Sequence, residues 1–239
     1  MPLIRSILSV FTLSLVTAWP VLAEDDVVLV LAGGGARGIA HVGAIAALEE
    51  LQVPVKGIAG TSMGALVGGL YAQGMDAEQL LAVVENMSWE EGFEDYVDRD
   101  NLTQGLMEDD YDYPAAVYVS IVDVNFSFPL VFVLGQQVRQ MIKDLSYNSD
   151  LIDDFDDLPT PYRAVATDIE TGDAYVFDGG DIVTAMRASM SLPGLLAPVE
   201  HDGRLLVDGG LAMNIPVSVG RELGGERLIV VDIGTPLRD

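Results

Sequence analysis

Residues 27–38 read Val-Val-Leu-Val-Leu-Ala-Gly-Gly-Gly-Ala-Arg-Gly, an unbroken apolar run that passes directly into a glycine-rich turn. The apolar, β-branched part at 27–32 predicts a strand buried on both faces, as in a parallel sheet. The glycines break that strand. Apolar residues at helical spacing over 39–51 then predict a helix, which Pro54 prevents from continuing. Strand, glycine turn and helix together indicate an α/β unit.

The same alternation of elements continues along the chain. Further strands are expected at 57–61, 116–122, 127–134, 162–168, 174–177, 204–207 and 227–233. Further helices are expected at 63–72, 77–87, 136–145, 181–189 and 216–223. The acidic, aromatic segment 88–113 has little periodicity and is typical of an inserted lid or binding loop. We therefore predict a three-layer α/β/α sandwich with a mostly parallel central sheet.

The two ends of the chain each give a separate prediction, one about export and one about a longer protein. Arg5, an apolar run at 7–16 and the small-residue end of Val21-Leu22-Ala23 predict a signal peptide cleaved after Ala23. A single membrane anchor is the alternative, but the run is shorter than the ~20 residues that a span needs. We expect one domain over 24–239, in a protein that is periplasmic, associated with the outer membrane or secreted. Because the sequence stops directly after a strand, it also predicts a piece cut from a longer protein.

The charge balance limits the possible partners. The chain holds 12 Lys+Arg against 37 Asp+Glu, a formal net charge of −25. Such a negative field repels nucleic-acid phosphates, so no nucleic-acid partner is expected. It also opposes electrostatic docking on anionic lipid headgroups. Any contact with a membrane surface is therefore expected to be apolar and transient.

The glycine-rich turn has two interpretations. Gly33, Gly35 and Gly38 match the G-x-G-x-x-G fingerprint of dinucleotide sites. Such a site also requires an acidic residue at the end of the second strand, where this chain has Gly60-Thr61-Ser62 instead, so the dinucleotide interpretation is disfavoured. The other interpretation is a row of backbone N–H groups at a helix N-terminus, which can bind an anion or the oxyanion of acyl transfer.

A second motif, Gly60-Thr61-Ser62-Met63-Gly64, lies between a predicted strand and a predicted helix. In this G-x-S-x-G pattern a sharp turn exposes the serine Oγ, and the glycines Gly60 and Gly64 let the backbone pass closely on both sides. Ser62 is then a candidate nucleophile. The structural alternative is a serine that only caps the following helix.

A nucleophilic serine needs a base, and the candidates are few. His41 lies within the first predicted helix, where a packing or surface role is expected, and His201 lies in a polar turn expected to face water. No histidine follows Asp202, as a triad in the order of the α/β hydrolases requires. Asp208, at the end of a predicted strand and before Gly209-Gly210, is the better candidate, although Asp-Gly is also a common turn. An aspartate can serve only where it is partly desolvated and within hydrogen-bond reach of the serine.

These motifs, in this order, resemble the patatin-like phospholipase family. Three further stretches share the resemblance, namely Ala166-Thr167-Asp168, residues 185–193 and Asn214-Ile215-Pro216-Val217. The resemblance implies a patatin-like hydrolase domain over 24–239 that cleaves acyl esters of phospholipids and related lipids without a metal or other cofactor. It implies Ser62 as the nucleophile and Asp208 as its activating partner. It assigns the oxyanion-hole loop to Gly33, Gly34, Gly35, Arg37 and Gly38.

A signal peptide before such a domain resembles an exported bacterial subgroup in which the domain precedes an outer-membrane β-barrel. Arg37 is expected to brace its loop rather than touch substrate. The alternative function is a catalytically silent protein that kept the fold for binding or regulation. Acyl-chain preference and oligomeric state are left open by the sequence.

Overall fold

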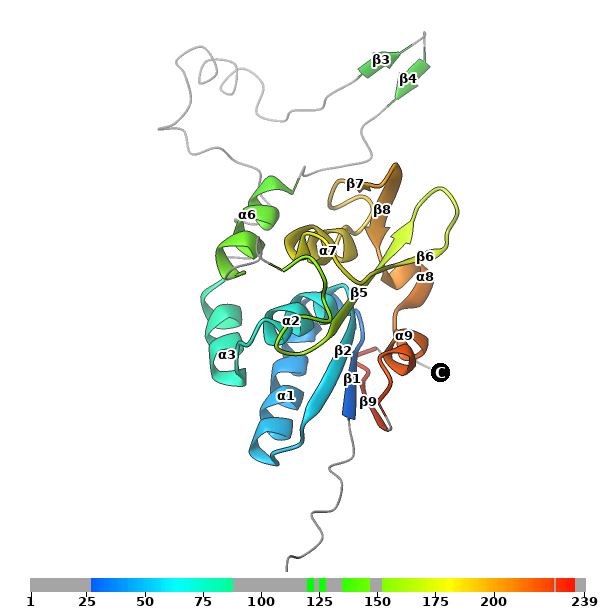
Figure 1. Ribbon diagram of the computed structural model, residues 1–239. Helices are drawn as coiled ribbons and strands as arrows, with labels where there is room; N and C mark the ends of the chain where they lie inside the picture. The colour runs from blue at the N-terminus through cyan, green and yellow to red at the C-terminus, as the bar shows by residue number, and fades with distance from the viewer. Residues whose placement is uncertain are drawn as a thin grey trace, which may run out of the picture.

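A computed structural model describes residues 27–87, 120–122, 125–127, 135–146, 152–225 and 227–234 (Figure 1). The predicted signal peptide, the acidic segment at 88–113 and the last five residues lie outside the described residues. Residues 116–122 and 127–134 were predicted to form two strands or a hairpin. Most of these two ranges lies outside the described residues; in the described part of this region, β3 (Ser120–Val122) pairs antiparallel with β4 (Asn125–Ser127).

Four parallel strands form the centre of the sheet. β1 (Val27–Leu31) lies between β2 (Val55–Thr61) and β9 (Arg227–Val231), and β2 also pairs with β5 (Tyr162–Asp168). All five residues of β1 are buried, because helices cover both faces of a parallel sheet. The prediction from the apolar run at 27–32 is therefore confirmed.

The other strands run antiparallel at one end of the sheet. β8 (Arg204–Asp208) and β6 (Ala174–Phe177) both pair with β5, and the short β7 (Val199–His201) pairs with β8. Ala164 and Val165 of β5 pair with both β2 and β6, so β2 and β6 must lie on opposite edges of β5. β8 in turn shares paired residues with β6, and so it lies on the same edge as β2.

This register brings the ends of two strands together. Thr61, the last residue of β2, pairs with Val165, and Asp208, the last residue of β8, pairs with the adjacent Ala166. β2 and β8 run toward each other along one edge of β5. The residues that follow β2 therefore meet the end of β8, although 146 positions separate Ser62 from Asp208 in the chain.

Helices cover the two faces of the sheet unequally (Figure 1). The thick layer contains α1 (Ala40–Glu50), α2 (Met63–Ala72), α3 (Ala77–Asn86), α6 (Gln136–Leu145) and α7 (Ile182–Ser189). The thin layer contains α8 (Gly210–Met213) and α9 (Val217–Glu222). Side chains from alternate strand positions enter separate cores, with Ile58 in the large one and Ala59 in the small one. The predicted three-layer α/β/α architecture is confirmed, with a mixed sheet whose centre is parallel.

Two details differ from the sequence prediction. The helix expected from residue 39 is preceded by a single 3₁₀ turn, η1 (Gly35–Ile39), so the helical backbone begins inside the glycine-rich stretch. The short β7 and α8 were not predicted. Both have fewer than five residues, too few for a periodic pattern to be recognised.

Nine of the ten residues of helix α2 are buried, and its glycines allow close packing against neighbouring elements. An added Cβ at Gly68 would lie 2.8 Å from the Ile58 side chain, and one at Gly69 would lie 2.6 Å from Met186 Sδ in α7. The helix is held between the sheet and α7. Its N-terminus, where Ser62 lies, is therefore part of the packed core rather than of a mobile loop.

Candidate active site

Ser62 lies on a sharp turn between β2 and α2. Its backbone has φ 53° and ψ −122°, a conformation that non-glycine residues rarely adopt. The flanking glycines make this turn possible: an added Cβ at Gly60 would lie 2.6 Å from the Gly64 carbonyl carbon, and one at Gly64 would lie 2.7 Å from the Ala32 carbonyl oxygen. Such strain costs about 1–3 kcal/mol and persists only where the surrounding structure enforces it.

Asp208 ends β8 directly opposite this turn. The Ser62 hydroxyl donates to Asp208 Oδ2 at 2.5 Å, and the Gly210 backbone N–H donates to Oδ1 at 2.7 Å. The residue is 7% exposed. Thr167 fixes the main chain at this point, because its hydroxyl donates to the Asp208 carbonyl oxygen at 2.9 Å. Both requirements placed on Asp208 by the sequence, partial desolvation and hydrogen-bond reach of Ser62, are present in the geometry.

The electrostatics of Asp208 follow from its burial. Burial raises the pKa of Asp208 above the ordinary aspartate value, while the hydrogen bonds from Ser62 and Gly210 act in the opposite direction. A carboxylate that is more basic than usual and accepts a hydrogen bond from a serine hydroxyl is suited to take the serine proton.

The glycine-rich loop lies beside Ser62. An added Cβ at Gly33 would lie 3.2 Å from Ser62 Cβ and 2.6 Å from Asn214 Oδ1, so only glycine fits there. The Gly33 N–H donates to the Asn214 carbonyl oxygen at 3.1 Å. Gly33 therefore brings the loop close to Ser62, but its own N–H is already engaged.

Other backbone donors are available around the serine. Gly34 and Gly35 open the 3₁₀ turn, and Met63 opens α2. No acceptor within the described part of the chain is recorded for the N–H groups of these three residues. Free N–H groups at two neighbouring helical N-termini favour a negative charge between them.

Gly38 and Arg37 differ in their roles. Gly38 is buried, and an added Cβ would overlap the Met63 side chain, so this glycine lets the loop pack against the residue after Ser62. Arg37 is exposed on the 3₁₀ turn. Of the five glycine-loop positions, Gly33 lies against Ser62 and Gly38 packs against Met63.

Sequence reasoning missed several polar residues that hold the site. Ser189, at the end of α7, accepts the Ser62 backbone N–H with its Oγ at 2.8 Å. The Asn214 side chain donates to the Gly33 carbonyl oxygen at 3.4 Å, and Thr61 donates to the Met213 carbonyl oxygen at 2.9 Å. Ser189 and Asn214 lie in stretches that carry the family resemblance, which was the available signal for them.

Neither histidine takes part in this arrangement. His41 is fully buried, its Nε2 lies 2.8 Å from the Ala32 carbonyl oxygen, and burial lowers its pKa, so it has the packing role expected of it. His201 was expected to face water. It is only partly exposed and packs against Tyr175 and Phe177, because the β6 aromatic residues cover its ring.

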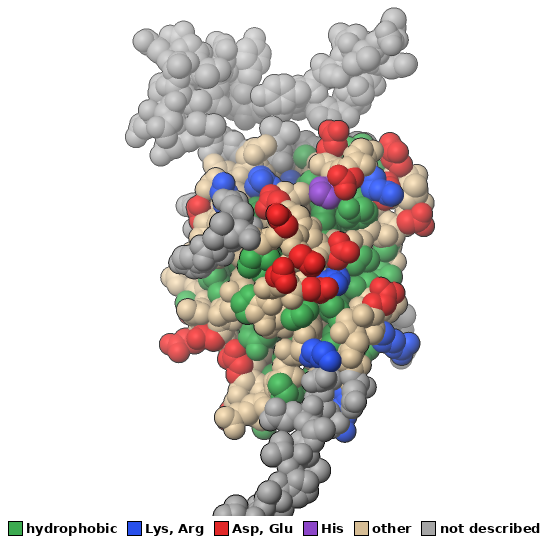
Figure 2. Space-filling view, in the orientation of Figure 1, with side chains coloured by type: hydrophobic (Ala, Val, Ile, Leu, Met, Phe, Trp, Pro, Cys, Tyr) green, Lys and Arg blue, Asp and Glu red, His purple; other side chains and the backbone are tan. Residues whose placement is uncertain are grey.

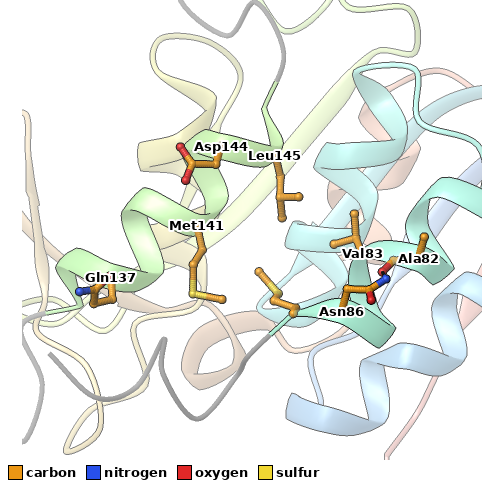
Figure 3. A pocket seen from close by; sticks show the side chains of 8 residues that line it. Ala82, Val83, Asn86, Gln137, Met141, Asp144 and Leu145 are labelled. Atoms are coloured by element: carbon orange, nitrogen blue, oxygen red, sulfur yellow. Dashed lines mark hydrogen bonds between the residues drawn. The ribbon is translucent and has the colours of Figure 1, made fainter. Parts of the chain in front are cut away.

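A cavity of about 530 Å³ lies elsewhere, between α3 and α6. Figure 3 shows Met141 and Leu145 of α6 facing Val83 of α3 across it. Ser62 and Asp208 do not line this cavity, so it is separate from the Ser62 turn.

A metal site and a membrane-spanning helix are both absent from the described residues. No group of His, Asp or Glu side chains in those ranges could hold a metal ion. Within the same ranges, no helix is long and apolar enough to cross a membrane.

Comparison with known proteins gives a consistent result. The model of the family described as "Patatin-like phospholipase" matches residues 29–220. Patatin-like phospholipase domain-containing protein ZK370.4 of Caenorhabditis elegans is 36% identical over 217 residues, which cover 90% of this chain and 14% of that protein. Lysophospholipase NTE1 of Cryptococcus neoformans is 33% identical over 214 residues, covering 90% of this chain and 12% of that protein.

These relatives are much longer than the chain, which spans 14% and 12% of their length. A solved structure with a similar fold is VipD from Legionella pneumophila, with a TM-score of 0.51 and 15% identity over 81% of this chain and 47% of that one. At this identity the similarity concerns the fold alone. The family model, in contrast, covers the glycine-rich loop, the end of β2 that leads into Ser62, and the end of β8 that carries Asp208. The chain therefore belongs to the patatin-like phospholipase family.

Proposed function

We propose that the chain is a serine-dependent lipid acyl hydrolase, of the phospholipase A or lysophospholipase type, with Ser62 as nucleophile and Asp208 as general base. The observation that carries the proposal is the 2.5 Å hydrogen bond from Ser62 Oγ to a largely buried carboxylate of raised pKa. The names of the two relatives, a patatin-like phospholipase domain-containing protein and a lysophospholipase, support the substrate class.

The geometry supports a two-step reaction. Asp208 takes the Ser62 proton as Oγ attacks the acyl carbonyl, and the oxyanion forms near the free N–H groups of Gly34, Gly35 and Met63. Asp208 then returns the proton to the leaving alcohol, giving an acyl-serine. Water, deprotonated by Asp208, hydrolyses this ester and frees Ser62.

The substrate must reach this site from a lipid phase. Acidic side chains are spread over the face seen in Figure 2, with apolar side chains between them, in keeping with the net charge of −25. We therefore expect transient apolar contact with membranes rather than tight binding to anionic headgroups.

Product analysis tests the proposed activity. The wild-type chain, incubated with mixed phospholipid and lysophospholipid vesicles, should release free fatty acids detectable by mass spectrometry. Ser62→Ala should release none, while the control Ser146→Ala should be normal, because the Ser146 hydroxyl is buried and has no recorded partner among the described residues. A folded wild-type chain without turnover on any lipid would favour the silent binding protein instead.

The cell location is a separate proposal. We propose export, on the basis of Arg5, the apolar run at 7–16 and the small-residue site ending at Ala23. Intact-mass measurement of the protein made in a secretion-competent bacterium should give a chain that begins at Glu24. An uncleaved chain in the membrane fraction would indicate the anchor alternative.

A further inference from the structure

The hydroxyl of Ser189 connects the strained turn to the central sheet. This serine is fully buried. Its Oγ accepts the Ser62 backbone N–H at 2.8 Å and donates to the Val165 carbonyl oxygen at 2.5 Å. Because the single hydroxyl hydrogen is directed to Val165, the oxygen lone pairs remain available for the N–H of Ser62.

The main chain around Ser189 also holds the second strand end. The Asp208 N–H donates to the Ser191 carbonyl oxygen at 2.9 Å, and the Gly209 N–H donates to the Ser189 carbonyl oxygen at 3.3 Å. The three residues 189–191 therefore contact the backbone of Ser62 and that of Asp208. They form a brace between two residues that no continuous strand connects.

This brace is itself anchored by a buried cation. Arg187 is 4% exposed, and its guanidinium donates to Ser191 Oγ. It also donates to the Gly135 carbonyl oxygen at 3.3 Å and to the Ala197 carbonyl oxygen at 3.2 Å. The brace thus has little freedom to shift. Its position is set by α7 and by the start of α6, not by the Ser62 turn.

We infer that Ser189 is a positioning residue, whose hydroxyl ties the strained backbone of Ser62 to Val165 in β5 and so holds Ser62 Oγ against Asp208. The inference rests on the proposed function and deepens it. Ser62 has φ 53°, and the part-buried hydrogen bond from its N–H to Ser189 Oγ opposes relaxation of the turn. Even a shift of about 1 Å in a reacting group costs on the order of 10²-fold in rate.

The main test is Ser189→Ala in the whole protein. Expected are a loss of about 10- to 100-fold in kcat and a KM within about threefold of wild type, since the substrate is not touched by Ser189. The acid limb of the pH profile should move to higher pH, because a loosened Ser62 hydrogen bond no longer lowers the Asp208 pKa. A merely structural role would leave that limb in place.

The control is Thr184→Val on the same helix. The Thr184 hydroxyl also has two partners, accepting from Arg139 at 2.8 Å and donating to Asp181 at 2.6 Å, but it does not contact the Ser62 turn. This variant should have wild-type kcat. Titration of active sites with a fluorophosphonate separates slower turnover from a smaller folded fraction.

Two further variants cover the case in which Ser189→Ala does not fold. Ser189→Thr keeps a hydroxyl and should retain most activity, whereas Ser189→Cys, a weaker hydrogen-bonding group, should lose kcat. The inference is overturned if Ser189→Ala or Ser189→Cys turns over at the wild-type rate per titrated site. If Ser62→Ala stays active, the proposed function fails; if only the Ser189 variants behave as wild type, the inference alone fails.

Discussion

Adding one methyl group at Gly60 should destroy the Ser62 turn. The new Cβ would lie 2.6 Å from the Gly64 carbonyl carbon and 2.7 Å from Ala65 Cα, where ordinary contacts begin at 3.4 Å. Both neighbours are backbone atoms of a buried helix, so a shift of at least about 0.8 Å must be taken by α2 or β2. Overpacking of this kind typically costs 1–3 kcal/mol, and we expect about 3 kcal/mol because no side chain can move aside.

The matched control is Gly57→Ala on the same strand. There the added Cβ lies 3.3 Å from the Leu223 side chain, which can yield by a tenth of an ångström. The lost chain entropy of the unfolded state adds about 0.4–1 kcal/mol of stability, so the net change should be within about 1 kcal/mol. Gly57→Ala should therefore behave as wild type.

The assay combines urea denaturation with the rate of fluorophosphonate labelling. Gly60→Ala should unfold at clearly lower urea, and its remaining folded fraction should be labelled about 10²-fold more slowly, because the Ser62 hydroxyl is displaced. Wild-type stability together with wild-type labelling in Gly60→Ala would refute the described packing of the turn.

Three further predictions concern pH, an ion pair and metals. Asp208 must be ionised to accept a proton, and burial raises its pKa, so kcat/KM should decline at acidic pH with a midpoint above pH 3.8, the ordinary aspartate pKa. A midpoint at or below pH 3.8 in the pH–rate profile would argue against Asp208 as the base. Arg204→Ala should lower the midpoint of urea denaturation at pH 7, because the Asp168 carboxylate loses its 2.9 Å partner. Burial acts to raise the pKa of Asp168, but hydrogen bonds from the Glu170 N–H and from Arg204 lower it below the ordinary value, so the loss of stability should shrink as pH falls through that lowered pKa; a loss that does not change with pH would contradict this origin. Dialysis against EDTA should leave turnover unchanged, since the proposed steps use only Ser62, Asp208 and backbone N–H groups; loss of activity that a divalent cation restores would contradict the mechanism.

The parts of the fold that depend on local pattern were predictable from the sequence. The buried strand at 27–31 and the helix after Ser62 follow from apolar runs and small residues. The glycines around Ser62 were predictable because the turn needs them by position. The physical reason is that Gly64 lies close to the carbonyl oxygens of Leu31 and Ala32, and only the structure shows this.

The parts that depend on long-range pairing were not predictable. Nothing in the local pattern shows that β8 runs antiparallel along the same edge of β5 as β2, yet this register is what brings Asp208 to Ser62. Ser189 lies 127 positions from Ser62 and reads as an ordinary helix-end serine. Its role depends on a buried hydroxyl between two main chains, which composition and spacing do not reveal.

Asp208→Asn tests the central claim most directly. The change keeps the side-chain shape and the acceptor for the Gly210 N–H but removes the base. Because the folded-state pKa of Asp208 is raised, its ionised form costs stability above that pKa, so the variant should be at least as stable as wild type at pH 7. We expect turnover of a lysophospholipid to fall by about 10²–10⁴-fold in this folded protein. Turnover near the wild-type rate would contradict the Ser62–Asp208 dyad.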